Sequence, residues 1–236
     1  MSITIIAHRC GTEKYPEQTM AAASHSLALG ADYVEMDVRY TAEGVPVICH
    51  DSNALRLFGE NSKISDLTAA EFLALRHTCN RCYSSHSLDD VLAGGIAPIL
   101  LHTKMSGSFI EDILVHLRSF DYEDKIVMGV QTADDVRRIK CFNPAIQTLA
   151  FMPSLDKCND FIESDADIIR LWEPWVSTEQ IEKIHTAGRK VWVMVGTPER
   201  VGYTTEENLC LLVHMGVDGV LINEIEWAKQ ILDEIK

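Results

Sequence analysis

The sequence lacks the long apolar run that a membrane-spanning helix requires. About 18 consecutive apolar residues would be needed to span a bilayer, and no segment of the 236-residue chain approaches that length. The first ten residues, MSITIIAHRC, also lack the basic start and long apolar stretch of a secretory signal. We therefore expect a cytoplasmic protein whose N-terminal residues enter a strand at once.

Basic residues are few, and this excludes classes of partner. The chain has 21 Lys and Arg against 35 Asp and Glu, a formal net charge of -14. Nucleic acids and acidic membranes require a basic face, so we expect neither as a partner. A phosphate-bearing small molecule is still compatible, because a local basic cluster or a metal ion can hold one anion.

The seven cysteines are an odd number, and without an export signal we expect reduced thiols. Cys79 and Cys82 form a lone C-x-x-C pair flanked by His77 and His86. A structural zinc site requires a second pair of ligands close by. We therefore favour a surface loop over a small zinc site.

Apolar runs of strand length alternate with helical patterns along the whole chain. Such alternation indicates βαβ units and a parallel sheet. The expected strands are Ser2–Ala7, Tyr33–Val38, Val45–Cys49, Ile96–Thr103, Lys125–Val130, Ile146–Met152, Asp167–Trp172, Lys190–Val195 and Val217–Ile222.

These strands predict a single (β/α)8 TIM barrel. Val45–Cys49 follows a turn at Gly44, so we expect it to be the return arm of a hairpin after strand 2, which leaves eight strands for a closed ring. The length suits one domain over residues 1–236, and a hydrophobic content of 47% can fill its core. An open doubly wound sheet is the alternative, but no Gly-rich dinucleotide or P-loop fingerprint follows any expected strand.

The segment Ala31–Asp51 carries the most distinctive chemistry. Period two places Glu35 and Asp37 on one face of a strand, and the return arm ends in His50 and Asp51. Two carboxylates with a histidine folded back beside them are suited to a metal site next to an acid/base group.

Other strands also end in polar residues, and in a parallel barrel such ends meet at one rim. The first strand ends in His8 and Arg9, and the strand after the hairpin ends in His102 and Lys104. The sequence therefore predicts a rim with two carboxylates, three histidines, one arginine and one lysine. Later strands add Gln131, Met152, Arg170, Trp172 and Gly196.

Five ordered motifs in the first quarter of the chain carry a family resemblance. They are HRCG at His8–Gly11, PEQT at Pro16–Thr19, GADYVEMDV at Gly30–Val38, TAEG at Thr41–Gly44 and VPVICHD at Val45–Asp51. Together with GVDGVLINE near the end, they make the chain resemble the glycerophosphodiester phosphodiesterase family of phospholipase-C-like barrels.

The resemblance implies hydrolysis of glycerophosphodiesters to an alcohol and glycerol phosphate. It implies one divalent metal on Glu35 and Asp37, and an acid/base pair of His8 and His50. Arg9 and Lys104 would then contact the substrate phosphate.

Where the family has a third metal carboxylate, this sequence has His102. The family implies Mg²⁺ or Ca²⁺, whereas a nitrogen ligand favours Mn²⁺, Fe²⁺ or Zn²⁺.

Two further departures lie at the rim. Cys10 replaces a family glycine, which predicts a reshaped loop because glycine permits positive φ. Residues 194–197 replace the family's W-T-x-N. A different phospholipid-type substrate, or an inactive member that binds a phosphorylated metabolite, are therefore the alternatives.

Each site residue also has a structural interpretation. Glu35 and Asp37 could be a solvated strand end, His8 and His50 hydrogen-bonded core residues, and His102 a neutral filler. Lys104 could simply pair with a carboxylate. We expect Glu17 to orient Arg9, and Arg170 and Trp172 to line the alcohol pocket, although Trp172 could serve barrel packing. For the assembly, a homodimer is our guess.

Overall fold

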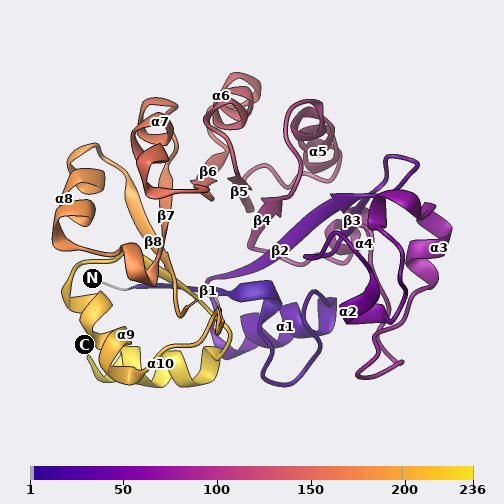
Figure 1. Cartoon of the computed structure of the whole chain (residues 1–236), viewed down its shortest axis with the longest axis horizontal. Coiled ribbons are helices and arrows are strands. Elements are labelled where there is room, and N and C mark those ends of the chain that lie inside the picture. The colour runs from indigo at the N-terminus through magenta and orange to yellow at the C-terminus, as the bar shows by residue number, and fades with distance from the viewer. Residues whose placement is uncertain (1–2, 198, 236) are drawn as a thin grey trace.

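The computed structural model describes residues 3–197 and 199–235. Their strands form one sheet in the order β1-β9-β8-β7-β6-β5-β4-β2-β3, and an additional β1–β2 pairing closes it into a ring (Figure 1). The strands are β1 (Thr4–Ala7), β2 (Tyr33–Tyr40), β3 (Pro46–Ile48), β4 (Ile99–Thr103), β5 (Ile126–Val130), β6 (Gln147–Ala150), β7 (Ile168–Trp172), β8 (Lys190–Met194) and β9 (Gly219–Ile222).

The ring confirms the predicted barrel and excludes the open sheet. Every pairing within it is parallel, whereas β3 lies outside and pairs antiparallel with β2, with Val38 opposite Ile48. The return arm of the hairpin was therefore predicted correctly. None of the helices among the described residues has the length and hydropathy that a bilayer span requires.

Helices cover the outside of the ring (Figure 1). Several begin where the sequence provides an N-cap hydroxyl, including Thr68, which forms a capping box with Glu71. The helices are α1 (Met20–Leu29), α2 (Leu55–Phe58), α3 (Ala69–Ala74), α4 (Leu88–Ala93), α5 (Ser108–Ser119), α6 (Ala133–Phe142), α7 (Cys158–Glu163), α8 (Thr178–Thr186), α9 (Glu206–His214) and α10 (Ile225–Glu234), with 3₁₀ turns η1 (His8–Cys10), η2 (Ile64–Asp66), η3 (Leu155–Lys157) and η4 (Glu173–Trp175).

Some boundaries differ from the sequence prediction for local reasons. The helix after the PEQT motif begins only at Met20, because Gln18 adopts a φ of 61° and Thr19 is the N-cap. The strand expected from Ile96 begins at Ile99, directly after Pro98, which has no N–H to donate to a ladder. The short helix α2 was not predicted.

The barrel interior is a layer of apolar side chains contributed by every strand of the ring. Its members pack on one another across the ring; they are Ile6, Tyr33, Leu100, Val127, Leu149, Ile168, Trp192 and Leu221. Because side chains alternate across a strand, the residue two positions further along each strand also points inward. That second layer is His8, Glu35, His102, Gly129, Phe151, Arg170, Met194 and Asn223, so the site lies directly on the apolar layer.

A separate apolar cluster lies beside the ring. It joins Val47 and Cys49 to Ala54, Leu57, Ile64, Leu67 and Phe72. We call residues 46–86 the rim lobe, because they carry β3, α2, η2 and α3 and return the chain to α4. His50 belongs to this lobe.

Gly129 makes room for an aromatic ring in the second layer. A Cβ at this position would lie 2.5 Å from Phe151 Cε2. The Phe151 ring in turn stacks on His102, with ring centroids 3.7 Å apart and an interplanar angle of 11°. Gly129 on β5 thus leaves the space in which the Phe151 ring stacks on His102.

We expect Gly129→Ala to destabilise the protein by about 1–3 kcal/mol, the usual cost of overpacking a core. Urea unfolding would measure the loss. The double variant Gly129→Ala/Phe151→Leu should recover part of it, because leucine removes the clashing ring edge. A Gly129→Ala protein that unfolds at the wild-type urea concentration would contradict this packing.

Candidate active site

Every site residue that the sequence predicts lines one cavity at the C-terminal ends of the strands. The cavity has a volume of about 240 Å³. It is lined by His8, Arg9, Glu35, Asp37, His50, His102, Lys104, Phe151, Arg170, Trp172, Met194 and Val201. Residues separated by up to 193 positions in the chain thus meet at one rim.

Glu35, Asp37 and His102 form a buried cluster on two adjacent strands. Asp37 of β2 is paired in register with His102 of β4. The His102 Nδ1 atom lies 3.0 Å from Asp37 Oδ1 and 3.7 Å from Glu35 Oε1. In the described part of the chain, this is the one group of three such side chains spaced to hold a metal ion. No such group forms around Cys79 and Cys82, which are both exposed.

Each carboxylate has one oxygen held by a hydrogen bond and one directed at His102. Arg9 N donates to Glu35 Oε2 at 2.7 Å, and Gln18 Nε2 donates to Asp37 Oδ2 at 2.6 Å. Lys104 Nζ lies 2.7 Å from Asp37 Oδ1, yet that buried oxygen accepts no well-directed hydrogen bond. A buried carboxylate oxygen without a directed donor fits a cation.

Burial and the closeness of charged groups shift the pKa values of all three side chains in the cluster. Burial, together with the charge of Asp37, raises the pKa of Glu35 to about 7. Burial also opposes ionisation of Asp37, but Lys104 and His102 hold its pKa well below the usual range. Burial and Lys104 lower the pKa of His102 to about 4, so His102 is a neutral imidazole with a lone pair to offer.

His8 is oriented by Asn223, which follows β9. The His8 Nδ1 atom lies 2.9 Å from Asn223 Oδ1, and the Asn223 amide nitrogen donates to the Val201 carbonyl at 3.0 Å. The amide oxygen therefore faces the ring, so His8 Nδ1 must carry the hydrogen. Burial lowers the pKa of His8, which leaves Nε2 as an acceptor.

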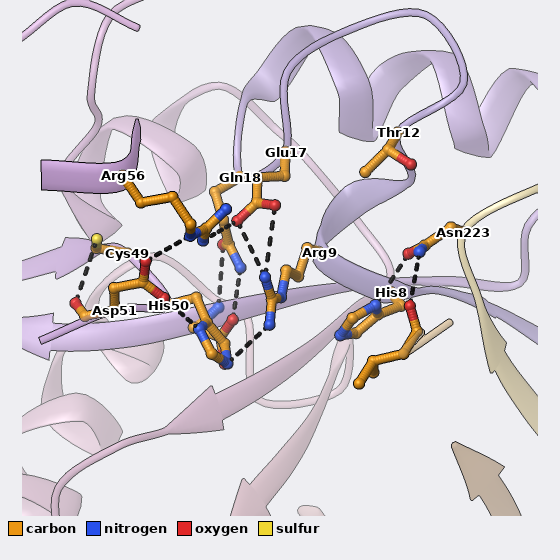
Figure 2. A network of polar contacts seen from close by, with 12 residues as sticks. His8, Arg9, Thr12, Glu17, Gln18, Cys49, His50, Asp51, Arg56 and Asn223 are labelled. Carbon is orange, nitrogen blue, oxygen red and sulfur yellow. Dashed lines mark hydrogen bonds and ion pairs between the residues drawn. The ribbon is translucent and has the colours of Figure 1, made fainter. Parts of the chain in front are cut away.

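His50 is held between a carboxylate and Arg9 (Figure 2). Its Nδ1 lies 2.7 Å from Asp51 Oδ1, and Arg9 Nη2 lies 3.0 Å from its Nε2. A guanidinium can only donate, so Nε2 is the acceptor here as well. Burial lowers the pKa of His50, and the ring is neutral.

Arg9 belongs to a charged network at the rim (Figure 2). Its Nη1 lies 3.3 Å from Glu17 Oε1, the contact that the sequence predicts. Arg56 of α2 bridges Glu17 and Asp51, with Nη2 2.6 Å from Glu17 Oε1. Arg56 therefore contacts both Glu17, the partner of Arg9, and Asp51, the partner of His50. The sequence analysis did not identify Arg56.

The loop after β1 keeps the conformation that a glycine would favour. Arg9, Cys10 and Gly11 have φ values of 50°, 73° and 79°. The buried Cys10 thiol donates to the Glu35 carbonyl at 3.6 Å. Cys10 therefore occupies the left-handed region itself, and the Arg9 amide still reaches Glu35.

The described residues combine a (β/α)8 barrel with an acidic cluster, two neutral imidazoles and two cationic side chains in one cavity. This arrangement defines a class of barrel enzyme that acts on phosphate esters. Residues 8–146 match the Glycerophosphoryl diester phosphodiesterase family. That match spans more than half of the chain. The chain therefore belongs to this family.

Known proteins are also similar to this chain in sequence or in fold. The uncharacterized protein YqiK of Bacillus subtilis is 24% identical over 97% of this chain and 98% of its own. Glycerophosphodiester phosphodiesterase 1 of Bos taurus is 37% identical over 78 residues, which are 33% of this chain and 24% of that protein. The structure of an Oleispira antarctica phosphodiesterase in complex with the product sn-glycerol-3-phosphate superimposes with a TM-score of 0.83, at 20% identity and coverages of 98% and 97%.

We expect the His8 ring to be in the Nδ1–H form at neutral pH, because Asn223 Oδ1 can only accept. Nitrogen-15 NMR of the imidazole would identify this tautomer. Asn223→Ala should give a mixture of tautomers, while the signals of His185, which is bound to Asp218 outside the cavity, stay unchanged. A wild-type ring protonated at Nε2 would contradict the assignment.

Proposed function

We propose that this protein hydrolyses glycerophosphodiesters to an alcohol and glycerol phosphate, using one divalent metal ion held by Glu35, Asp37 and His102. The observation that carries the proposal is the directed set of side chains in one cavity: the acidic cluster, His8, His50, Arg9 and Lys104. Family membership supports the substrate class.

Arg9 and Lys104 would receive the substrate phosphate. In the free protein their charges face Glu17 and Asp37. A phosphodiester has acceptor oxygens that can replace these partners. Movement of the Arg9 guanidinium onto phosphate would also release Nε2 of His50. A divalent ion in the cluster supplies further charge neutralisation for the phosphate oxygens.

His8 and His50 would carry out the proton transfers. Both present Nε2 with Nδ1 tied to a fixed partner, Asn223 or Asp51. For turnover, one of the two rings would first take up a proton from solvent at Nε2. The neutral ring then accepts the proton of the attacking hydroxyl, the protonated ring gives its Nε2 proton to the leaving alcohol, and the two roles reverse when water opens the cyclic phosphate. A neighbouring hydroxyl of the substrate is the proposed nucleophile, which gives a cyclic phosphate that water then opens.

The binding-protein alternative is less well supported. A member that had lost its metal would be expected to turn His102 away from the carboxylates. Instead, His102 lies 3.0 Å from Asp37 Oδ1 and is supported from behind by Phe151. The cytoplasmic location and the homodimer expected from the sequence remain predictions.

We expect the metal-stripped protein to regain glycerophosphodiester hydrolysis when one divalent ion is restored. Release of glycerol phosphate, measured during titration with Mg²⁺, Ca²⁺, Mn²⁺ or Zn²⁺, would test this. His50→Ala should lower turnover about 100-fold or more, the usual contribution of an acid/base group. The matched control is His214→Ala on the outer helix α9. Wild-type turnover in His50→Ala would refute the role of His50, and no turnover with any ion would favour the binding protein.

The identity of the third ligand should determine metal preference. His102→Glu would give an all-oxygen set, so we expect the affinity ratio of Mg²⁺ to Zn²⁺ to rise about 10-fold or more. Calorimetric titration of the purified variants would measure it. Glu35→Gln and Asp37→Asn should lose binding of both ions. An unchanged ratio in His102→Glu would show that His102 is not a ligand.

A further inference from the structure

Arg170 is a buried cation with no acidic partner among the residues that the structure describes. It lies on β7, lines the cavity, and is 5% exposed. Its Nε and Nη1 atoms are buried and donate to no acceptor in the described residues. Burial lowers its pKa to about 10, so the guanidinium is still charged at neutral pH. A buried charge with unsatisfied donors destabilises a fold unless something compensates for it.

The surroundings of Arg170 hold its position but do not satisfy its hydrogen bonds. Its Cζ atom lies 4.4 Å from the centroid of the Trp172 ring, 5.2 Å from Phe151 and 5.9 Å from Trp175. These cation–π contacts favour the charge, but ring faces are poor substitutes for oxygen acceptors. The rings therefore leave these donors unpaired in a side chain that lines the cavity.

In the proposed function, Arg9 and Lys104 supply the cationic contacts of the scissile phosphate. Arg9 and Lys104 approach the metal cluster, and each has a carboxylate partner in the free protein. Arg170 has no carboxylate partner in the described residues. The Phe151 ring, which contacts both His102 and Arg170, lies between it and the cluster. This position suits a second group of the substrate, beyond the phosphate.

We propose that Arg170 binds an anionic group, a carboxylate or a second phosphate, on the alcohol half of the substrate. The inference rests on the proposed phosphodiesterase function and specifies its substrate class. A guanidinium presents paired donors that match either oxyanion. The same charge repels the ammonium groups of choline and ethanolamine, so the site selects against cationic alcohols.

The aromatic rings around Arg170 add to this selection against cationic alcohols. Three rings around one point form the kind of cage that recognises a quaternary ammonium. In this protein the guanidinium of Arg170 fills that cage. Removal of the side chain should therefore weaken binding of anionic alcohols and, at the same time, open a place for a cationic one.

The test uses four diesters of glycerol phosphate that differ in the alcohol: glycerol, glycerate, glycerol phosphate and choline. With wild-type protein we expect the highest kcat/KM for the glycerate or glycerol phosphate diester, and the better of the two identifies the oxyanion. Arg170→Gln should lower kcat/KM for both anionic diesters about 10- to 100-fold, the range for a charge-assisted hydrogen bond. The glycerol diester should change less than about 3-fold on the same scale.

Arg170→Ala should raise kcat/KM for the choline diester, because it empties the aromatic cage. Arg137→Gln, an exposed arginine of α6 paired with Asp134, is the charge-matched control and should leave all four values unchanged. Urea unfolding of Arg170→Gln checks the fold: loss of an unpaired buried charge offsets the lost cation–π contacts, so the midpoint should stay close to the wild-type value. A lower midpoint would give Arg170 a structural role and overturn the proposal.

Two kinetic results would also overturn the inference while leaving the phosphodiesterase intact. An equal loss for all four diesters would place Arg170 on the scissile phosphate, and no loss would leave it without a ligand. If wild-type protein hydrolyses none of the diesters, the proposed function itself fails. Calorimetry with free glycerate and glycerol then tests the anion site alone: glycerate must bind more tightly than glycerol, and Arg170→Gln must abolish the difference.

Discussion

The structure depends on how two buried carboxyl groups are stabilised inside a barrel. Glu35 and Asp37 are on the same face of β2, with exposed fractions of 2% and 0%. Such burial is unfavourable unless hydrogen bonds and opposite charges compensate for it. The compensation comes from outside β2: the Arg9 amide after β1, Gln18 before α1, and His102 and Lys104 on β4. The β1–β2 pairing that closes the ring thus also brings the Arg9 amide to Glu35.

The free protein keeps its cationic side chains on internal partners. Arg9 contacts Glu17 and His50, and Lys104 contacts Asp37. These pairs hold the side chains in the cavity, so little conformational entropy remains to be lost when a phosphate binds. A chain with a net charge of -14 can in this way present a locally cationic cavity to an anion.

The sequence predicted most of the ring and of the acidic cluster because both follow from period two. Alternation places Glu35 and Asp37 on one face, and the strand-end rule locates His8, His102 and Arg170. The same rule would have identified Asn223, which stands two residues after Leu221 as His8 stands after Ile6. Arg56 and the stacking of Phe151 on His102 could not be predicted, because they depend on how a lobe docks and how a ring fills the space above Gly129.

The rim lobe has a mechanical consequence for the acid/base pair. His8 stands on the ring, whereas His50 stands on the lobe, which has an apolar cluster of its own. The separation between these two imidazoles is therefore governed by lobe docking, through β3 and the bridge of Arg56 to Glu17. Under gradual heating, the pair should come out of alignment once the lobe loosens, while the eight-stranded ring is still intact. Inactivation would then precede unfolding, and the lobe, not the barrel, would set the working temperature of the enzyme.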